Sequence, residues 1–169
     1  MVTEQKYISK IPLINVDIII VKHFETLLED SSKFCFYLYF VIIPLASAIF
    51  LLLLQKTLAA DSANTLITAF SIFTGLLLNV ILIIFAIVDR REVKDADRKT
   101  LFEHLYANSI YALLFSTLLL LFLILLVVLN DWKNLTVVVF FSFIIYFGVV
   151  HFIMTLLMIF KRLFVLVFE

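Results

Sequence analysis

The chain contains very few of the residues on which several other classes of protein depend. Its 169 residues include one cysteine and two glycines, and only 15% are charged. A single cysteine excludes an intrachain disulfide and a cysteine-based zinc site, and two glycines cannot build a glycine-rich phosphate loop. The formal net charge is zero, which gives no electrostatic basis for nucleic-acid binding. We therefore expect no enzyme, no cofactor, no metal site and no direct nucleic-acid partner.

Hydrophobic residues, by contrast, make up 64% of the chain, and its mean hydropathy is +1.18. A chain with so little polar surface could not cover its own exterior in water. Four apolar blocks reach the roughly 20 residues that a helix needs to cross a bilayer. They cover residues 34–54, 66–88, 105–129 and 135–160, and none alternates like a β-barrel strand. The sequence predicts an all-α integral membrane protein with four transmembrane helices in one domain, residues 34–162.

Two shorter segments flank this domain. Within residues 1–33, the stretch 14–29 has apolar residues at helical spacing, which predicts an amphipathic helix in the interface plane or against the cytosolic helix ends. The apolar face of this helix comprises Ile20, Val21, Phe24, Leu27 and Leu28. A strand at residues 18–21 is the alternative. Residues 163–169 form a short apolar tail.

The densest run of charge in the interior of the chain lies at residues 89–104, between the second and third spans. It divides the four spans into two antiparallel hairpins, and we expect it to extend both neighbouring helices around a turn near residues 95–97. Its five basic residues are Arg90, Arg91, Lys94, Arg98 and Lys99. Basic residues at a helix end favour contact with lipid headgroups or with a protein partner.

The distribution of lysine and arginine predicts the orientation. Of the thirteen in the chain, eleven fall on the side that the N-terminus, the charged run and the C-terminus share. Only Lys56 and Lys133 fall on the other side. Because cytoplasmic loops carry the excess of positive residues, both termini are predicted to be cytosolic in the inner or plasma membrane.

Four residues that are polar or break helices stand about ten positions from the inner end of their spans, which is roughly 15 Å at 1.5 Å per residue. This predicted midplane layer comprises Pro44, Asn79, Ser116 and His151. Pro44 should also kink its helix, because proline has no N–H to donate. His151 is the only residue deep within a span that titrates near neutral pH, and such residues are functional candidates. It is either a proton-sensitive permeation element or, as we favour, a neutral ring bonded to Asn79 or a backbone carbonyl.

Small residues recur on one face of the last three spans, and such faces let transmembrane helices approach closely. The predicted helix-packing face comprises Ser71, Gly75, Asn79, Ser109, Ala112, Gly148 and Thr155.

Nearly all of the predicted non-membrane chain faces the cytosol. This geometry predicts a non-enzymatic membrane subunit that anchors, senses or signals to a cytosolic protein partner, as a homo-oligomer. Small proteins of this build accompany cytosolic effectors in bacteria, including antiviral defence systems, which is an analogy of fold alone. The alternative is an oligomeric channel or membrane-permeabilising effector lined by Asn79 and His151.

Overall fold

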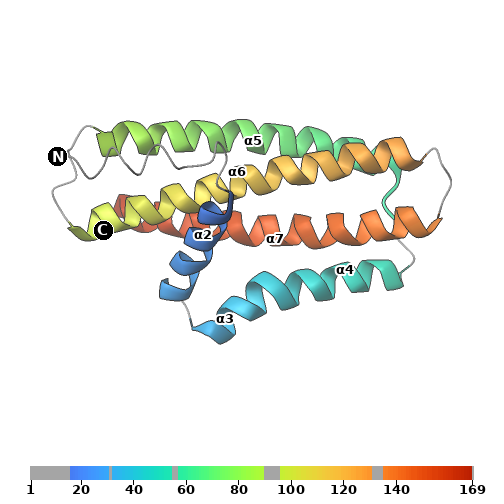
Figure 1. Cartoon of the computed structure of the whole chain (residues 1–169), viewed down its shortest axis with the longest axis horizontal. Coiled ribbons are helices and arrows are strands. Elements are labelled where there is room, and N and C mark those ends of the chain that lie inside the picture. The colour runs from blue at the N-terminus through green and yellow to red at the C-terminus, as the bar shows by residue number, and fades with distance from the viewer. Residues whose placement is uncertain (1–15, 31, 55–56, 90–95, 131–134, 169) are drawn as a thin grey trace.

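In the computed structural model, every regular element of the described residues (16–30, 32–54, 57–89, 96–130 and 135–168) is helical (Figure 1). The elements are α2 (Val16–Asp30), α3 (Lys33–Tyr37), the π-helix η1 (Leu38–Ile42), α4 (Ile43–Leu53), α5 (Ala60–Asp89), α6 (Ala96–Asn130) and α7 (Leu135–Phe168). Residues 18–21 belong to α2, so the strand alternative does not form there.

Four helical segments are long and apolar enough to cross a membrane: Lys33–Leu53, Ala60–Ala86, Arg98–Leu129 and Leu135–Val165. This confirms the prediction of an all-helical chain with four helices that could span a membrane. The helices extend beyond the predicted spans. α5 begins at Ala60, where Asp61 in the first turn complements the helix dipole. α7 continues to Phe168 through the predicted tail, since no glycine or proline follows Lys161.

The helices pack in an order that differs from their order along the chain. α6 lies between α5 and α7 and contacts both, while α4 packs against α7 (Figure 1). α4 and α5, the predicted first hairpin, do not contact each other in the described residues. α2 crosses the bundle against α6 and touches α3. The described part of the segment joining α4 to α5 is tied to α7 instead, because the Leu58 N–H donates to the Ser142 hydroxyl over 3.0 Å.

The core of the bundle has a seven-residue repeat. Buried residues of α6 alternate in steps of three and four: Phe102, Leu105, Ser109, Ala112, Ser116, Leu119, Leu123 and Leu126. Buried residues of α5 stand seven apart: Ala63, Phe70, Leu77 and Ile84. This spacing keeps one seam of each helix toward its neighbour and is typical of left-handed helix packing. The buried residues of α6 with this repeat thus lie on the side of the helix that packs against both α5 and α7.

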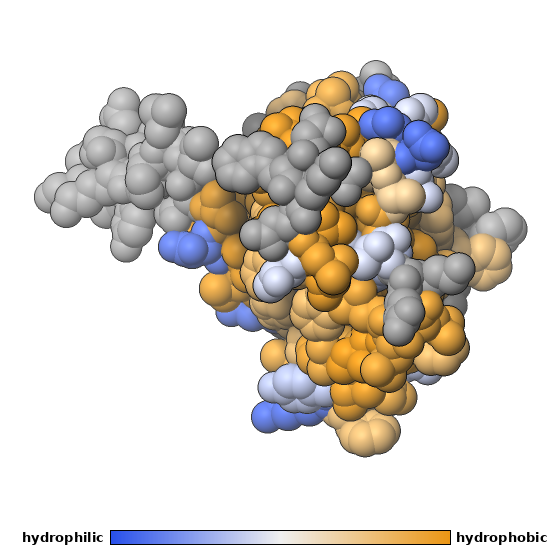
Figure 2. Space-filling model, turned by 90° about the vertical axis from the view of Figure 1, so that its right-hand side faces the viewer, coloured by the Kyte–Doolittle hydropathy of each residue, from blue (hydrophilic) through white to orange (hydrophobic). Residues whose placement is uncertain are grey.

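Polarity is distributed inside out relative to a protein that folds in water. Asn108 and Ser116 are fully buried (0% exposed), whereas Ile83 and Phe140 are each 60% exposed. Figure 2 views the end of the bundle at which α4 ends and α7 begins, and apolar residues cover most of the face that it shows. Large apolar side chains toward lipid and small or polar ones between helices is the arrangement expected of a membrane bundle.

The two glycines provide a matched test of this packing. A Cβ on Gly148 would collide with the Leu119 side chain, whereas a Cβ on Gly75 would meet nothing within 4 Å. We expect Gly148→Leu to lower the thermal unfolding temperature in detergent by several degrees, and Gly75→Leu to leave the monomer's unfolding temperature unchanged. Equal losses in the two variants would contradict the assignment of the α6–α7 contact face.

Candidate functional site

The site begins at Pro44, which follows η1 and is buried. In a continuous α-helix the N–H of residue 44 would donate to the Phe40 carbonyl, but proline has no N–H. A backbone carbonyl without a partner is costly inside a membrane, because no water can replace the lost bond. The π-helix at Leu38–Ile42 marks the same local departure from α geometry. The sequence therefore places an available acceptor, the Phe40 oxygen, inside the first span.

His151 of α7 satisfies that acceptor. Its Nδ1 lies 3.0 Å from the Phe40 oxygen, and its Nε2 lies 2.9 Å from the Tyr111 hydroxyl on α6. Because a carbonyl can only accept, Nδ1 carries the proton, and a neutral ring then accepts the Tyr111 hydroxyl hydrogen at Nε2. The ring is also enclosed by Phe40, Phe115 and other aromatic side chains. One imidazole thus joins three spans without needing a charge.

A second histidine, His23 of α2, extends the network. Its Nδ1 lies 2.6 Å from Asn108 Oδ1, and its ring stacks on Tyr111 with centroids 3.6 Å apart and planes 6° from parallel. The Asn108 amide nitrogen donates to the His104 carbonyl over 2.6 Å, which fixes the orientation of the amide. The Thr26 hydroxyl lies 3.1 Å from the same Asn108 oxygen. His23 therefore donates from Nδ1, and its buried Nε2 has no hydrogen-bond partner in the described part of the chain.

Burial lowers the pKa of His23 from 6.5 to about 3, and the nearby positive charge of Arg162 acts in the same direction. The hydrogen bond to Asn108 opposes this shift but does not outweigh it. His23 is completely shielded from solvent (0% exposed), and removing a charged ring from water costs free energy. The docked α2 thus requires a neutral His23 at physiological pH.

Arg162 links the last turns of α2 to α6 and α7. Its guanidinium donates to the Thr26 carbonyl over 2.9 Å and to the His104 carbonyl over 3.3 Å, and its side chain is buried. A cation near the C-terminal end of a helix also interacts favourably with the helix dipole. Leu27, Phe36 and Phe40 form a small apolar cluster beside this polar contact. The face of α2 that packs on the bundle is therefore partly polar.

The structure brings together only part of the predicted midplane layer. Pro44 leaves the Phe40 carbonyl free for His151, and Pro44, Phe40 and His151 are all buried. We call the buried contact between α2, η1, α6 and α7 the junction. Ser116 is buried but contacts Thr74, with 3.0 Å between the hydroxyl oxygens. Asn79 is exposed on the outer face of α5. The four residues do not share one contact, and a common depth in the membrane stays a prediction.

The predicted helix-packing face divides in the same way. Ser109, Ala112, Gly148 and Thr155 are buried between helices. Ser71, Gly75 and Asn79, all of α5, face outward from the single chain. The Ser71 hydroxyl donates to the Ile67 carbonyl of its own helix over 2.8 Å, so it needs no neighbouring helix as a partner. A role for this outward face between two chains stays a prediction.

The predicted basic segment lies largely outside the described residues, which exclude Arg90, Arg91 and Lys94. Arg98 and Lys99 are exposed in the first turns of α6. Lys99 lies 4.0 Å from Glu103, and both side chains are more than half exposed. Such surface pairs contribute little to stability. These two basic residues are accessible at the same end of the bundle as Arg162.

Sequence reasoning missed most of the junction: His23, Thr26, Asn108, Tyr111 and the role of Arg162. A weak signal was present, because His23, Thr26 and Leu27 share one helical face at three- and four-residue spacing. The apolar face expected for this segment instead leaves Val21 and Leu28 exposed.

Chemically, the junction can hold α2 in place and can respond to protonation. Among the described residues there is no cluster of three or more potential metal ligands.

The low pKa of His23 predicts a pH-dependent docking of α2. Undocked, His23 would titrate near 6.5, and docked near 3. Acid therefore favours the undocked helix by up to about tenfold per pH unit below 6.5. We expect hydrogen-exchange protection of α2 amides, corrected for intrinsic rates, to fall between pH 7.5 and pH 5.5. In His23→Phe, which keeps a ring on Tyr111, the protection should be independent of pH. An equal fall in both proteins would contradict the assignment to His23.

No protein-family model, no curated protein and no solved structure matches this chain. The functional proposal below therefore depends on the residues and geometry of this chain alone.

Proposed function

We propose that the chain is a non-enzymatic integral membrane subunit that holds α2 at the cytosolic end of its bundle and presents it to a cytosolic protein. The observation that carries this proposal is the buried attachment of one face of α2, through His23, Thr26 and Arg162. The opposite face stays open, with Ile18 and Val21 each 53% exposed. A fixed helix with an exposed apolar face is suited to binding a partner.

The cytosolic location of both termini is part of the same proposal. Its support is the distribution of lysine and arginine, since eleven of the thirteen fall on the side that the termini share. In that orientation α2, the first turns of α6 and the basic residues Arg98 and Lys99 face the same compartment. A partner could thus contact α2 and the charged segment together.

Assembly into a homo-oligomer is the second part of the proposal. The face of α5 around Gly75 is open, because a Cβ added at Gly75 would meet nothing within 4 Å. Such a face allows close approach of a second helix. The channel alternative has less support. Both ring nitrogens of His151 are engaged within one chain, and Asn79 lies on an outer face away from it.

Site-specific photocrosslinking in the native host tests the partner proposal. A photoreactive residue at Val21, on the open face of α2, should form an adduct with a protein. The same residue at Phe140, which is 60% exposed on α7, should react with lipid and serves as the control. Arg162→Met removes the bond to the Thr26 carbonyl and should weaken the Val21 adduct at unchanged expression. If Val21 forms adducts with lipid only, the partner proposal is wrong.

A further inference from the structure

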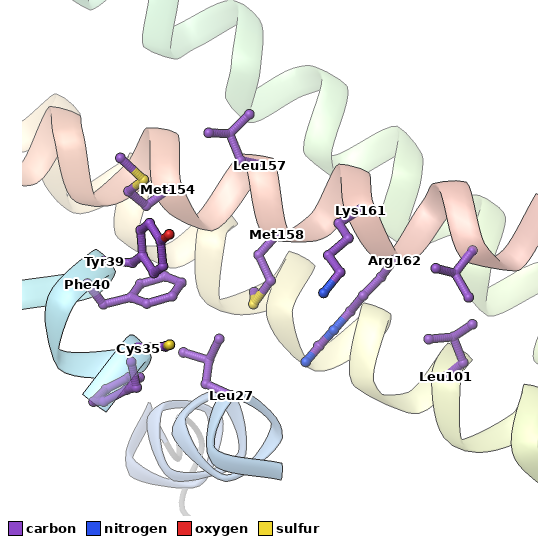
Figure 3. A pocket seen from close by; sticks show the side chains of 12 residues that line it. Leu27, Cys35, Tyr39, Phe40, Leu101, Met154, Leu157, Met158, Lys161 and Arg162 are labelled. Carbon is purple, nitrogen blue, oxygen red and sulfur yellow. The ribbon is translucent and has the colours of Figure 1, made fainter. Parts of the chain in front are cut away.

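A cavity of about 650 Å³ lies beside the junction, between α3, η1 and α7. Its size is within the usual range for small-molecule sites. Figure 3 shows its walls: Tyr39 and Phe40 come from η1, Cys35 lies beside them on α3, Leu27 comes from α2, and Met154 and Met158 project from α7. The junction already described uses only the edge of this cavity, through Phe40 and Arg162.

Two parts of the cavity differ in chemistry. Met154, Leu157, Met158 and Phe40 make one end apolar, and Lys161 and Arg162 bring two positive charges next to it, with Leu101 beyond them (Figure 3). In Figure 3 the Lys161 ammonium and the Arg162 guanidinium extend from α7 toward the same side. No acidic residue is among those that line the cavity in the described part of the chain. The cavity thus has a cationic part and an apolar part.

The side chains of Lys161 and Arg162 differ in how freely they can move. Arg162 is buried and holds the Thr26 and His104 carbonyls, so it contributes its charge from a fixed position. Lys161 is exposed, and its flexible side chain carries three donors that can turn toward a ligand. Lys161 is therefore the residue that would contact an anion directly, with Arg162 adding a positive field behind it.

The position of the cavity relative to the membrane limits what can fill it. Lys161 lies near the end of the apolar segment Leu135–Val165, where headgroups meet the hydrocarbon core. Met154 lies seven residues earlier on the same helix, about 10 Å deeper at 1.5 Å per residue. A ligand that fills the cavity must place a negative group at the surface and an alkyl chain toward the midplane.

We propose that this cavity binds one anionic phospholipid, with its phosphate on Lys161 and an acyl chain along Met154 and Met158. Basic pockets between transmembrane helices on the cytoplasmic side suit anionic headgroups for the same electrostatic reason. The lipid would also pack against Leu27 and thereby reinforce the docking of α2. The site adds a ligand to the bundle and does not depend on a protein partner.

Native mass spectrometry of the full-length protein in detergent tests the proposal with two lipids, phosphatidylglycerol and phosphatidylethanolamine. The wild type should retain phosphatidylglycerol preferentially. Lys161→Gln should weaken that binding about fivefold, as expected from roughly 1 kcal/mol per lysine near an anionic surface, and weaken phosphatidylethanolamine binding less, because the ammonium of that lipid offsets its phosphate. Lys99→Gln makes the same charge change outside the cavity and should weaken phosphatidylglycerol binding less than Lys161→Gln does.

Two further measurements distinguish binding of the lipid headgroup from binding of its acyl chain. Met158→Trp keeps both cations but fills the apolar end, so it should reduce phosphatidylglycerol binding. Equal binding of this lipid by the wild type and Lys161→Gln, or an equal loss in Lys99→Gln, would overturn the proposal. So would unchanged binding in Met158→Trp. Retention of inorganic phosphate as tightly as phosphatidylglycerol would show a free-anion site instead of a lipid site.

Discussion

The fold depends on a constraint that Pro44 imposes on the first span. In lipid every backbone polar group needs a partner within the protein, and Pro44 leaves the Phe40 carbonyl without its α-helical donor. His151 supplies the donor over 3.0 Å and in turn contacts the Tyr111 hydroxyl. This explains how a histidine is accommodated between the helices, and why α4 packs on α7 and not on its neighbour in the chain, α5.

Tyr111 connects this interaction to α2. One side of its ring stacks on His23, while its hydroxyl contacts His151. Arg162 then holds the far end of α2 through the Thr26 carbonyl. A single buried network therefore joins the first candidate span, the two longest helices and α2, which is not among the four candidate spans. The same network separates two surfaces of α2, a buried face that fixes it and an open face that includes Ile18 and Val21.

The sequence predicts the parts of the fold that depend on composition and length. Four apolar blocks and the helical spacing of residues 14–29 suffice to predict four helices long and apolar enough to cross a membrane, and to predict α2. The sequence also brings Pro44 and His151 into one hypothesis, and the structure places the His151 ring 3.0 Å from the Phe40 carbonyl that Pro44 leaves without its α-helical donor. The seven-residue spacing of Phe70 and Leu77 marks the side of α5 that is buried, whereas the small residues around Gly75 lie on the exposed side.

The rotation of each helix and the choice of neighbours were not predictable. Asn79 faces outward, since no local pattern states which side of α5 meets α6. The bonds of the junction join residues 85 positions apart (His23 and Asn108) and 136 apart (Arg162 and Thr26). Such distant pairs form only because of the way in which the helices pack, with α4 against α7 and α2 against α6. The face of α2 was misjudged because its buried side includes a histidine and a threonine.

A double-mutant cycle between Pro44 and His151 tests most directly whether the Phe40 carbonyl requires His151. His151→Leu alone should lower the free energy of unfolding in mixed micelles by about 1–2 kcal/mol, because it removes two intramembrane hydrogen bonds. Pro44→Ala restores an N–H that can reach the Phe40 carbonyl. In that background His151→Leu should therefore cost measurably less, by about 0.6 kcal/mol or more. If the two substitutions are additive, the carbonyl freed by Pro44 is not what holds His151 in place.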